Sequence, residues 1–521
     1  MGCRSTPISP QAHRLLQLTS STTFDNNSAC YQTALALKPG YAEAHINLGS
    51  VLQSRGNLDE AVACYRQALS LKPGYAEAHS NLGGALKDQG LLEEAVVCYQ
   101  QALALKPGSA VTHSNLVYTL YFCPDYDASM IHDAHRLWNQ QHALPLATHI
   151  RPHNNDRTPH RRLRIGYVSP NFHAHPVGLF VLPLLESHNH EDFEIVCYSS
   201  VEVQDQFTSR FCSHADTWRK VLGFSDEQVA NTVRQDRIDI LVDLTLHMNK
   251  NRLLVFARRP APVQVTYLGY CGTTGMSAMD YRLTDPYLDP PNQTGEFYSE
   301  QSIWLPETYW CYRPMLTAPD VNALPALRNG YFTFGCLNNF GKVTVPTLEA
   351  WCRLLKTMPQ SRLLLHAKIG SHRDRVRDFF SEQGISPERL LFAEMVPTSE
   401  YFQLYGKVDV ALDPFPYNGG TTTFDAMWMG VPVVSLAGQT SVGRAGLSIL
   451  SNVGLEALVA RDVDEYVLIA RDLANDLPRL AQLRECLRQR MEVSPLMDSP
   501  RFARNIEAAY RRMWQQWCDQ R

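Results

Sequence analysis

A loop rich in glycine and threonine carries the clearest chemical signal in this sequence. It lies in the segment DPFPYNGGTTTFDAMWMGVPVV, residues 413–434, between an apolar strand and an apolar helix. Gly419 and Gly420 would let a phosphate approach the backbone closely, and the amides and dipole at the helix start favour a pyrophosphate. The hydroxyls of Thr421 and Thr422 add donors. No GK[ST] follows, so ATP hydrolysis is not indicated; an ordinary strand–turn–helix connection is the alternative.

A second polar segment follows another apolar strand. It reads GCLNNFGKVTV and places Asn339 and Lys342 at the carboxyl end of that strand. A lysine there could neutralise charge on a departing diphosphate, the task that a metal ion performs in other transferases; a solvated loop lysine is the alternative. Asp425, one turn into the helix after the glycine loop, could accept hydrogen bonds from ribose hydroxyls.

Two histidines in the segment NFHAHP could act as ligands or as acid–base groups. His173 and His175 are close enough to suggest a metal pair, but the sequence supplies no convincing third ligand and no HExxH or DxD motif. We therefore expect no metal cofactor. A histidine in a cleft could serve as a base or bind an acceptor; a structural loop residue is the alternative.

The elements that must position these residues form two α/β series. Short apolar, β-branched runs alternate with helical segments, which is typical of a parallel sheet covered on both faces. The runs of the first series are residues 163–169, 193–199, 238–244, 263–269 and 279–285. Those of the second series are residues 332–338, 361–367, 389–395, 408–414 and 431–437. Two such units usually bind their ligand between them, at the carboxyl ends of the strands.

A 34-residue repeat precedes the two series. Residues 41–74 and 75–108 are similar along their whole length, and each has the tetratricopeptide pattern of two helices that stack on neighbouring repeats. Asn47, Asn81 and Asn115 hold the same position in successive repeats. Their amides could bind the backbone of an extended peptide as a ladder, although asparagine can also be simply usual at this helix position.

These patterns predict a short α-solenoid followed by two Rossmann-like units. The expected division is an N-terminal lead at 1–28, repeats at 29–123, a helical linker at 124–162, a first α/β half at 163–325, a second α/β half at 326–498 and a C-terminal helix at 499–521.

Composition limits the classes of function. The 521 residues are 45% hydrophobic and carry a formal net charge of −4, so neither a nucleic-acid surface nor an anionic-membrane surface is expected. No stretch approaches the ~18 apolar residues of a membrane span, and residues 1–20 do not resemble a signal peptide. The thirteen cysteines include no CxxC pair, which favours a reducing, cytoplasmic location.

Taken together and in order, these motifs resemble those of the protein O-linked N-acetylglucosamine transferase family, in its bacterial and plant SPINDLY-like branch. The resemblance covers about residues 30–517 and also includes RRPAPVQ, LGYCGTTG and DYRLTD. It implies a GT-B fold, inversion at the anomeric carbon without a metal, and presentation of an acceptor protein by the repeats.

The resemblance also implies roles for individual residues. His175 is similar to the active-site histidine near acceptor and sugar, and Lys342 to the lysine that contacts the diphosphate and assists the leaving group. Asn339 stands where the family has Gln or Asn near the nucleotide. Thr421 and Thr422 resemble the phosphate-binding pair. Asp425 resembles the ribose-binding acid.

Four positions depart from the family pattern. Asp239 stands where animal members carry a histidine, Leu246 precedes His247 where this branch usually has Gly-His, Cys271 replaces the usual proline of LGYPGT, and Gly420 replaces a histidine of animal members. These departures bear on the choice of donor and acceptor more than on the fold.

The expected function is transfer of N-acetylglucosamine from UDP-GlcNAc to Ser or Thr of proteins. Plant SPINDLY proteins, which the chain resembles, imply a first alternative, transfer of fucose from GDP-fucose. The second alternative is an inactive repeat scaffold, and a weaker third is a glycosyltransferase for small molecules.

Overall fold

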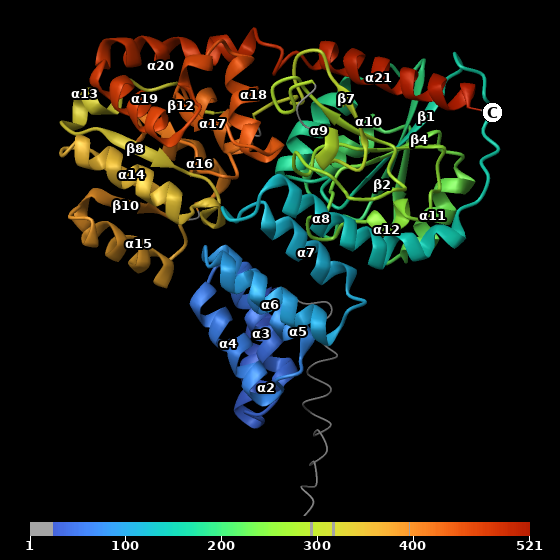
Figure 1. The fold of residues 1–521 in the computed structure, drawn as a ribbon, viewed down its shortest axis with the longest axis horizontal. Coiled ribbons are helices and arrows are strands. Elements are labelled where there is room, and N and C mark those ends of the chain that lie inside the picture. The colour runs from blue at the N-terminus through green and yellow to red at the C-terminus, as the bar shows by residue number, and fades with distance from the viewer. Residues whose placement is uncertain (1–23, 292–294, 315–317, 395, 521) are drawn as a thin grey trace, which may run out of the picture.

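The structure is a computed structural model that describes residues 24–520 except 292–294, 315–317 and 395. The helical array and the two α/β units of the prediction are both present (Figure 1). The predicted N-terminal lead lies outside the described residues except for its last part, which begins a helix at Phe24. None of the described helices combines the length and the apolar character that crossing a membrane requires.

The array consists of antiparallel helices stacked in pairs. Its helices are α2 (Phe24–Leu37), α3 (Ala42–Arg55), α4 (Leu58–Leu71), α5 (Ala76–Asp88), α6 (Leu92–Leu105) and α7 (Ala110–Leu120). Small residues let the two helices of a pair approach: a Cβ on Gly49 would lie 2.7 Å from the Tyr65 ring, and one on Gly83 would lie 3.0 Å from Tyr99. Gly56 ends α3 in the left-handed region, with φ of 91°, which glycine adopts without strain.

The connection to the first sheet is only partly helical. It contains α8 (Ala128–Trp138), a π-turn (Asn139–Ala143) and a 3-10 helix (Leu144–His149), followed by irregular chain as far as residue 162. The linker expected at 124–162 is therefore helical as far as His149 and irregular over its last third.

The first sheet is parallel, in the order β3-β2-β1-β4-β5-β6-β7. Its strands are β1 (Leu163–Ser169), β2 (Phe193–Ser199), β3 (Thr217–Lys220), β4 (Ile240–Asp243), β5 (Val263–Thr266), β6 (Tyr281–Thr284) and β7 (Gln301–Trp304). Helices cover it: α9 (Pro176–Ser187), α10 (Gln206–His214), α11 (Asp226–Gln235) and α12 (Leu253–Phe256). Sequence patterns missed β3 and β7 because these edge strands are partly exposed and polar.

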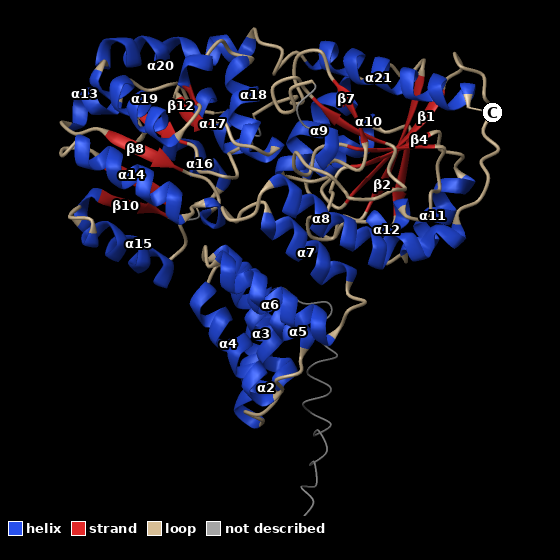
Figure 2. Cartoon of the chain, viewed as in Figure 1, coloured by secondary structure: helices blue, strands red, loops and turns tan. Residues whose placement is uncertain are grey.

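The second sheet is also parallel, in the order β10-β9-β8-β11-β12-β13. Helices surround its strands (Figure 2). Its strands are β8 (Thr333–Cys336), β9 (Arg362–His366), β10 (Leu390–Ala393), β11 (Val410–Leu412), β12 (Val433–Leu436) and β13 (Val459–Ala460). The helices of this half are α13 (Pro325–Asn329), α14 (Val345–Thr357), α15 (Ser371–Glu382), α16 (Thr398–Tyr405), α17 (Thr421–Trp428), α18 (Ala445–Ser451), α19 (Val463–Asn475) and α20 (Leu477–Glu492).

The C-terminal helix α21 (Ser499–Asp519) returns to the first half (Figure 1). The hydroxyls of Tyr510 and Tyr167 in β1 are 3.1 Å apart, and the Glu507 carboxylate lies 2.9 Å from His188. The helix thus ties the end of the second half to the start of the first, which its apolar stripe alone did not reveal.

Polar contacts hold the three parts together. Between the halves, Asp289 pairs with buried Arg282 at 2.7 Å and accepts a hydrogen bond from Ser441 of the second half at 2.9 Å. The array contacts the second half through Asp59 of α4, which accepts from the amide and hydroxyl of Ser371 at the start of α15, both at 2.7 Å. The array therefore packs directly against the second half.

Candidate functional site

A cavity of about 340 Å³ lies where α7 and the two halves meet. In both sheets the cavity is at the carboxyl ends of the strands, near the positions where the strand order reverses, β1 beside β4 and β8 beside β11. Open α/β sheets bind their ligands at such switch points. The predicted residues that line it are His175, Asn339, Lys342, Gly419, Gly420, Thr421 and Thr422.

The glycine loop leaves the start of α17 open toward the cavity. Buried Asp413 fixes the loop by accepting a hydrogen bond from the Gly419 amide at 2.7 Å, and burial raises the pKa of this carboxyl to about 6. A Cβ on Gly419 would lie 2.5 Å from the Thr423 hydroxyl, so the close turn requires glycine. Gly420, which precedes α17, has no side chain to cap the helix, so the first amides remain for an anion.

Lys342 contacts this loop directly. Its ammonium donates to the Asn418 carbonyl at 2.6 Å and lies 4.0 Å from the centre of the Tyr417 ring. The lysine ends a 3-10 turn (Phe340–Lys342) that follows β8. Burial lowers its pKa to about 8, while Asp413 opposes the shift. The cation and the α17 amides therefore face one cavity, as a site for a diphosphate requires.

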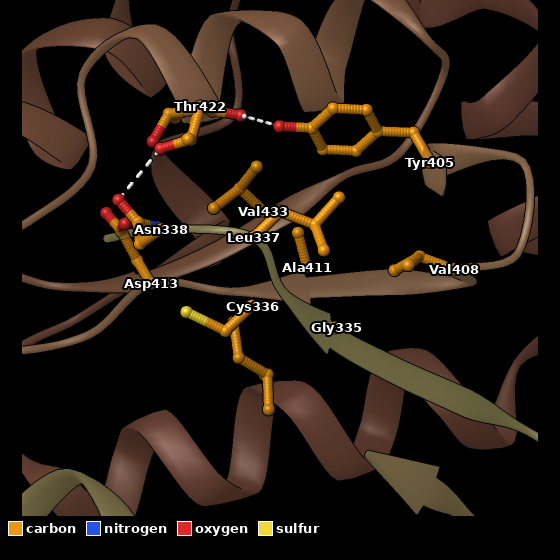
Figure 3. Close-up of a pocket in the computed structure, with 12 residues that line it drawn as sticks. Gly335, Cys336, Leu337, Asn338, Tyr405, Val408, Ala411, Asp413, Thr422 and Val433 are labelled. Carbon is orange, nitrogen blue, oxygen red and sulfur yellow. Dashed lines mark hydrogen bonds between the residues drawn. The ribbon is translucent and has the colours of Figure 1, made fainter. Parts of the chain in front are cut away.

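Thr422 is held from two sides beneath the loop (Figure 3). Its hydroxyl donates to the Asn338 side chain at 2.8 Å, and its carbonyl accepts from the Tyr405 hydroxyl at 3.2 Å. The Asn339 side chain instead accepts from the Gly341 amide at 3.0 Å and caps the turn that carries Lys342. Of this pair of asparagines, Asn338 orients the helix start and Asn339 orients the lysine turn.

Asp425 does not line the cavity in this structure. Its carboxylate accepts hydrogen bonds from Tyr312 at 2.6 Å and from Tyr401 at 2.9 Å, and only 5% of the residue is exposed. Burial raises its pKa to about 6. Both oxygens are thus engaged by tyrosines that the sequence patterns did not single out, and the ribose contact of Asp425 stays a prediction.

His175 caps α9 and lines the cavity. Its Nδ1 accepts the Val177 amide hydrogen at 3.2 Å, and burial, with His173 nearby, lowers its pKa to about 4. The ring is therefore neutral at pH 7 and carries its proton on Nε2. In this tautomer it can donate a hydrogen bond to a sugar or acceptor oxygen, but a role as general base would require the loss of the Val177 contact.

His173 and His175, whose spacing suggested a metal pair, lie near each other. The rings of His173 and His175 are 5.7 Å apart, and the described residues contain no group of three or more His, Cys, Asp or Glu side chains that could hold a metal ion. Independence from metal stays a prediction.

The repeat asparagines stand on adjacent first helices. Asn47, Asn81 and Asn115 lie in α3, α5 and α7 and are all half-buried. The Asn81 amide lies 3.5 Å from the Ser50 hydroxyl of the preceding repeat. Their binding of an acceptor backbone stays a prediction.

Two departures from the family pattern have structural roles. Asp239 is buried and accepts from Arg161 at 2.6 and 2.7 Å. His247 is buried beside α7, with its ring 3.0 Å from the Ser114 hydroxyl and 2.8 Å from the Thr274 carbonyl. Neither side chain lines the cavity.

Aromatic residues that the sequence patterns did not single out complete the cavity. They are Tyr118, Phe180, Tyr270, Tyr309, Trp310 and Tyr417. From the sequence alone, aromatic side chains in helices and loops are predicted to belong to the hydrophobic core. Only their common position at the junction of the three parts identifies them as cavity residues.

Two Rossmann-like halves, with a cavity between them that Lys342 and the start of α17 line, define a glycosyltransferase of the GT-B class. A model of glycosyl transferase family 41 matches residues 142–316 and 312–506, and models described as TPR repeat and tetratricopeptide repeat match residues 52–90 and 76–109. The chain belongs to glycosyl transferase family 41.

Plant proteins and one bacterial structure are similar to the chain. Proteins named probable UDP-N-acetylglucosamine–peptide N-acetylglucosaminyltransferase SPINDLY from Solanum lycopersicum and Hordeum vulgare are each 40% identical over 397 residues, which is 75% of this chain and 42% of theirs. The chain thus spans about two fifths of the length of these relatives. The solved structure is a Thermobaculum terrenum O-GlcNAc transferase with a lysine-to-methionine substitution; it is 37% identical, with a TM-score of 0.91, and the match covers 97% of this chain and 96% of that one.

Proposed function

We propose that the protein transfers N-acetylglucosamine from UDP-GlcNAc to serine or threonine hydroxyls of proteins. The proposal rests on one observation: Lys342 and the start of α17 line the same cavity, which Tyr118 of the repeat array also lines. The names of the similar plant proteins and of the bacterial structure refer to the same sugar, which favours it over fucose.

The proposed reaction is a single displacement. The acceptor oxygen attacks the anomeric carbon from the face opposite the nucleotide, the bond from that carbon to the phosphate oxygen breaks, and UDP leaves with the bonding electrons. The Lys342 ammonium and the first amides of α17 stabilise the charge that develops on the diphosphate. The cavity and the array supply orientation.

The destination of the acceptor proton follows from the histidine geometry. Because the Nδ1 atom of His175 is engaged by Val177, His175 orients sugar or acceptor by donation from Nε2. The proton then passes to a phosphate oxygen of the donor or to water. Metal has no part in this scheme.

The repeats are proposed to bind the acceptor through Asn47, Asn81 and Asn115. A reducing, cytoplasmic location is proposed because every cysteine among the described residues is a free thiol.

The test is incubation of the protein with a cell lysate and either UDP-GlcNAc or GDP-fucose, followed by mass spectrometry of the lysate proteins. We expect an N-acetylhexosamine mass on Ser or Thr with UDP-GlcNAc alone, and none with Lys342→Ala. A deoxyhexose mass with GDP-fucose would establish the alternative donor. If thermal-shift assays show that neither nucleotide sugar binds, the chain is an inactive scaffold.

A further inference from the structure

Three tyrosines connect the repeat array to the catalytic lysine. Tyr118 comes from α7, Tyr270 from the loop after β5 and Tyr417 from the glycine loop, and all three line the cavity. The Tyr118 ring centre lies 5.0 Å from that of Tyr270 and 6.4 Å from that of Tyr417, perpendicular to the latter. The Tyr118 ring thus meets the Tyr417 ring edge to face.

Tyr417 is the link that contacts Lys342. Its ring centre lies 4.0 Å from the lysine ammonium, and its other neighbour is Phe122, with ring centres 4.7 Å apart. A cation over an aromatic face is stabilised most where water is excluded, and the Lys342 side chain is largely shielded from water. The position of this ring therefore affects how readily the lysine carries its charge.

Tyr118 lies on the acceptor side of the same contact. It follows Asn115 by three residues in α7, so the two side chains lie on the same face of the helix. Lys87 of α5 lies 5.5 Å from the centre of the Tyr118 ring and 3.9 Å from the Asp88 carboxylate. A peptide bound along the asparagine row would meet Tyr118 where the array ends and the cavity begins.

We propose that Tyr118 is a positioning residue: its ring packs edge to face on the Tyr417 ring, holds that ring against the Lys342 ammonium, and so couples the acceptor-binding face of the repeats to stabilisation of the leaving group. The inference rests on the proposed function. It adds a residue from the repeats to the machinery that serves the donor.

The charged surroundings allow the contribution of the ring to be measured. The groups that face the Lys342 ammonium are the Asp413 carboxyl, the Cys336 and Cys271 thiols and the Tyr417 ring, with the Asn418 carbonyl as its hydrogen-bond acceptor. Lys87 and Asp88 face Tyr118. A change at Tyr118 or Tyr417 alone leaves every carboxylate and thiol around the lysine in place.

The test compares Tyr118→Leu, Tyr417→Leu and the double variant. Loss of either ring should lower kcat by about 3- to 10-fold, and the double variant should lose no more than Tyr417→Leu alone, because Tyr118 acts through the Tyr417 ring. Tyr417→Leu removes the ring, so the pH at which the affinity for UDP falls should move down by roughly half to one unit. Calorimetry with UDP, and in parallel with GDP, measures that pH.

Tyr75→Leu is the matched control. Tyr75 also lies beneath a lysine, Lys72, at 4.1 Å, but in the repeats; the control should keep kcat and the pH dependence of the wild type. Additive losses in the double variant, or an unchanged pH profile in Tyr417→Leu, would overturn the inference while transfer by the wild type upholds the proposed function. If neither nucleotide binds to the wild type, both proposals fall.

Discussion

The charge of Lys342 should set the alkaline limit of activity. The ammonium has to be protonated to stabilise a departing diphosphate, and burial lowers its pKa to about 8. With that value, about 90% of the free enzyme carries the charge at pH 7 and about 10% at pH 9. We therefore expect kcat/KM to fall roughly tenfold between these two pH values.

The assay is the pH dependence of initial rates with limiting donor and saturating acceptor. Because kcat/KM reports the free enzyme, the alkaline limb of its pH profile should have its midpoint near pH 8. The alkaline limb of the kcat profile should lie at higher pH, since a bound diphosphate stabilises the ammonium. In Lys342→Arg the guanidinium stays protonated throughout, so the limb should disappear although the absolute rate falls.

Lys72→Arg provides the control, because this lysine also lies over a tyrosine ring but is exposed in the repeats. Its pH profile should match that of the wild type. A wild-type limb that persists unchanged in Lys342→Arg, or a kcat/KM that is flat up to pH 10, would refute the role given to the lysine.

Three further outcomes are expected. Lys342→Ala should melt within a few degrees of the wild type but lose about 100- to 1,000-fold in kcat; wild-type turnover would contradict its role. His175→Asn should keep an acceptor at the start of α9, and hence its melting temperature, while kcat falls, and a large loss of stability would instead indicate a structural role. Burial lowers the pKa of His135 to about 4, so as pH falls below 6.5 the unfolded chain binds a proton that the folded protein does not. The free energy of unfolding should therefore drop by about 2 kcal/mol from pH 7 to pH 5. Urea unfolding of His135→Gln should show a correspondingly weaker dependence on pH.

Local patterns were sufficient for the architecture and for most of the site. The 34-residue repeats and the buried central strands each have a pattern of apolar residues within a short stretch of chain, so composition and spacing predict them. The NGGTTT loop, Lys342 and His175 follow strands or begin helices, and the carboxyl ends of parallel strands meet at one edge. Their common cavity could therefore be expected without coordinates.

The tertiary structure decided whatever depends on residues far apart in the chain. The sequence suggests that the Asp425 carboxylate is free to bind a ligand. In the structure it accepts hydrogen bonds from Tyr401 and from Tyr312, which is 113 residues away. Tyr118 reads as an ordinary repeat residue, yet folding places it beside Tyr417, nearly 300 positions later. Helix α21 returns to the first half although it follows the second in sequence. The spacing of residues along a chain describes its local geometry, whereas these contacts arise only when separate elements pack together and exclude water between them.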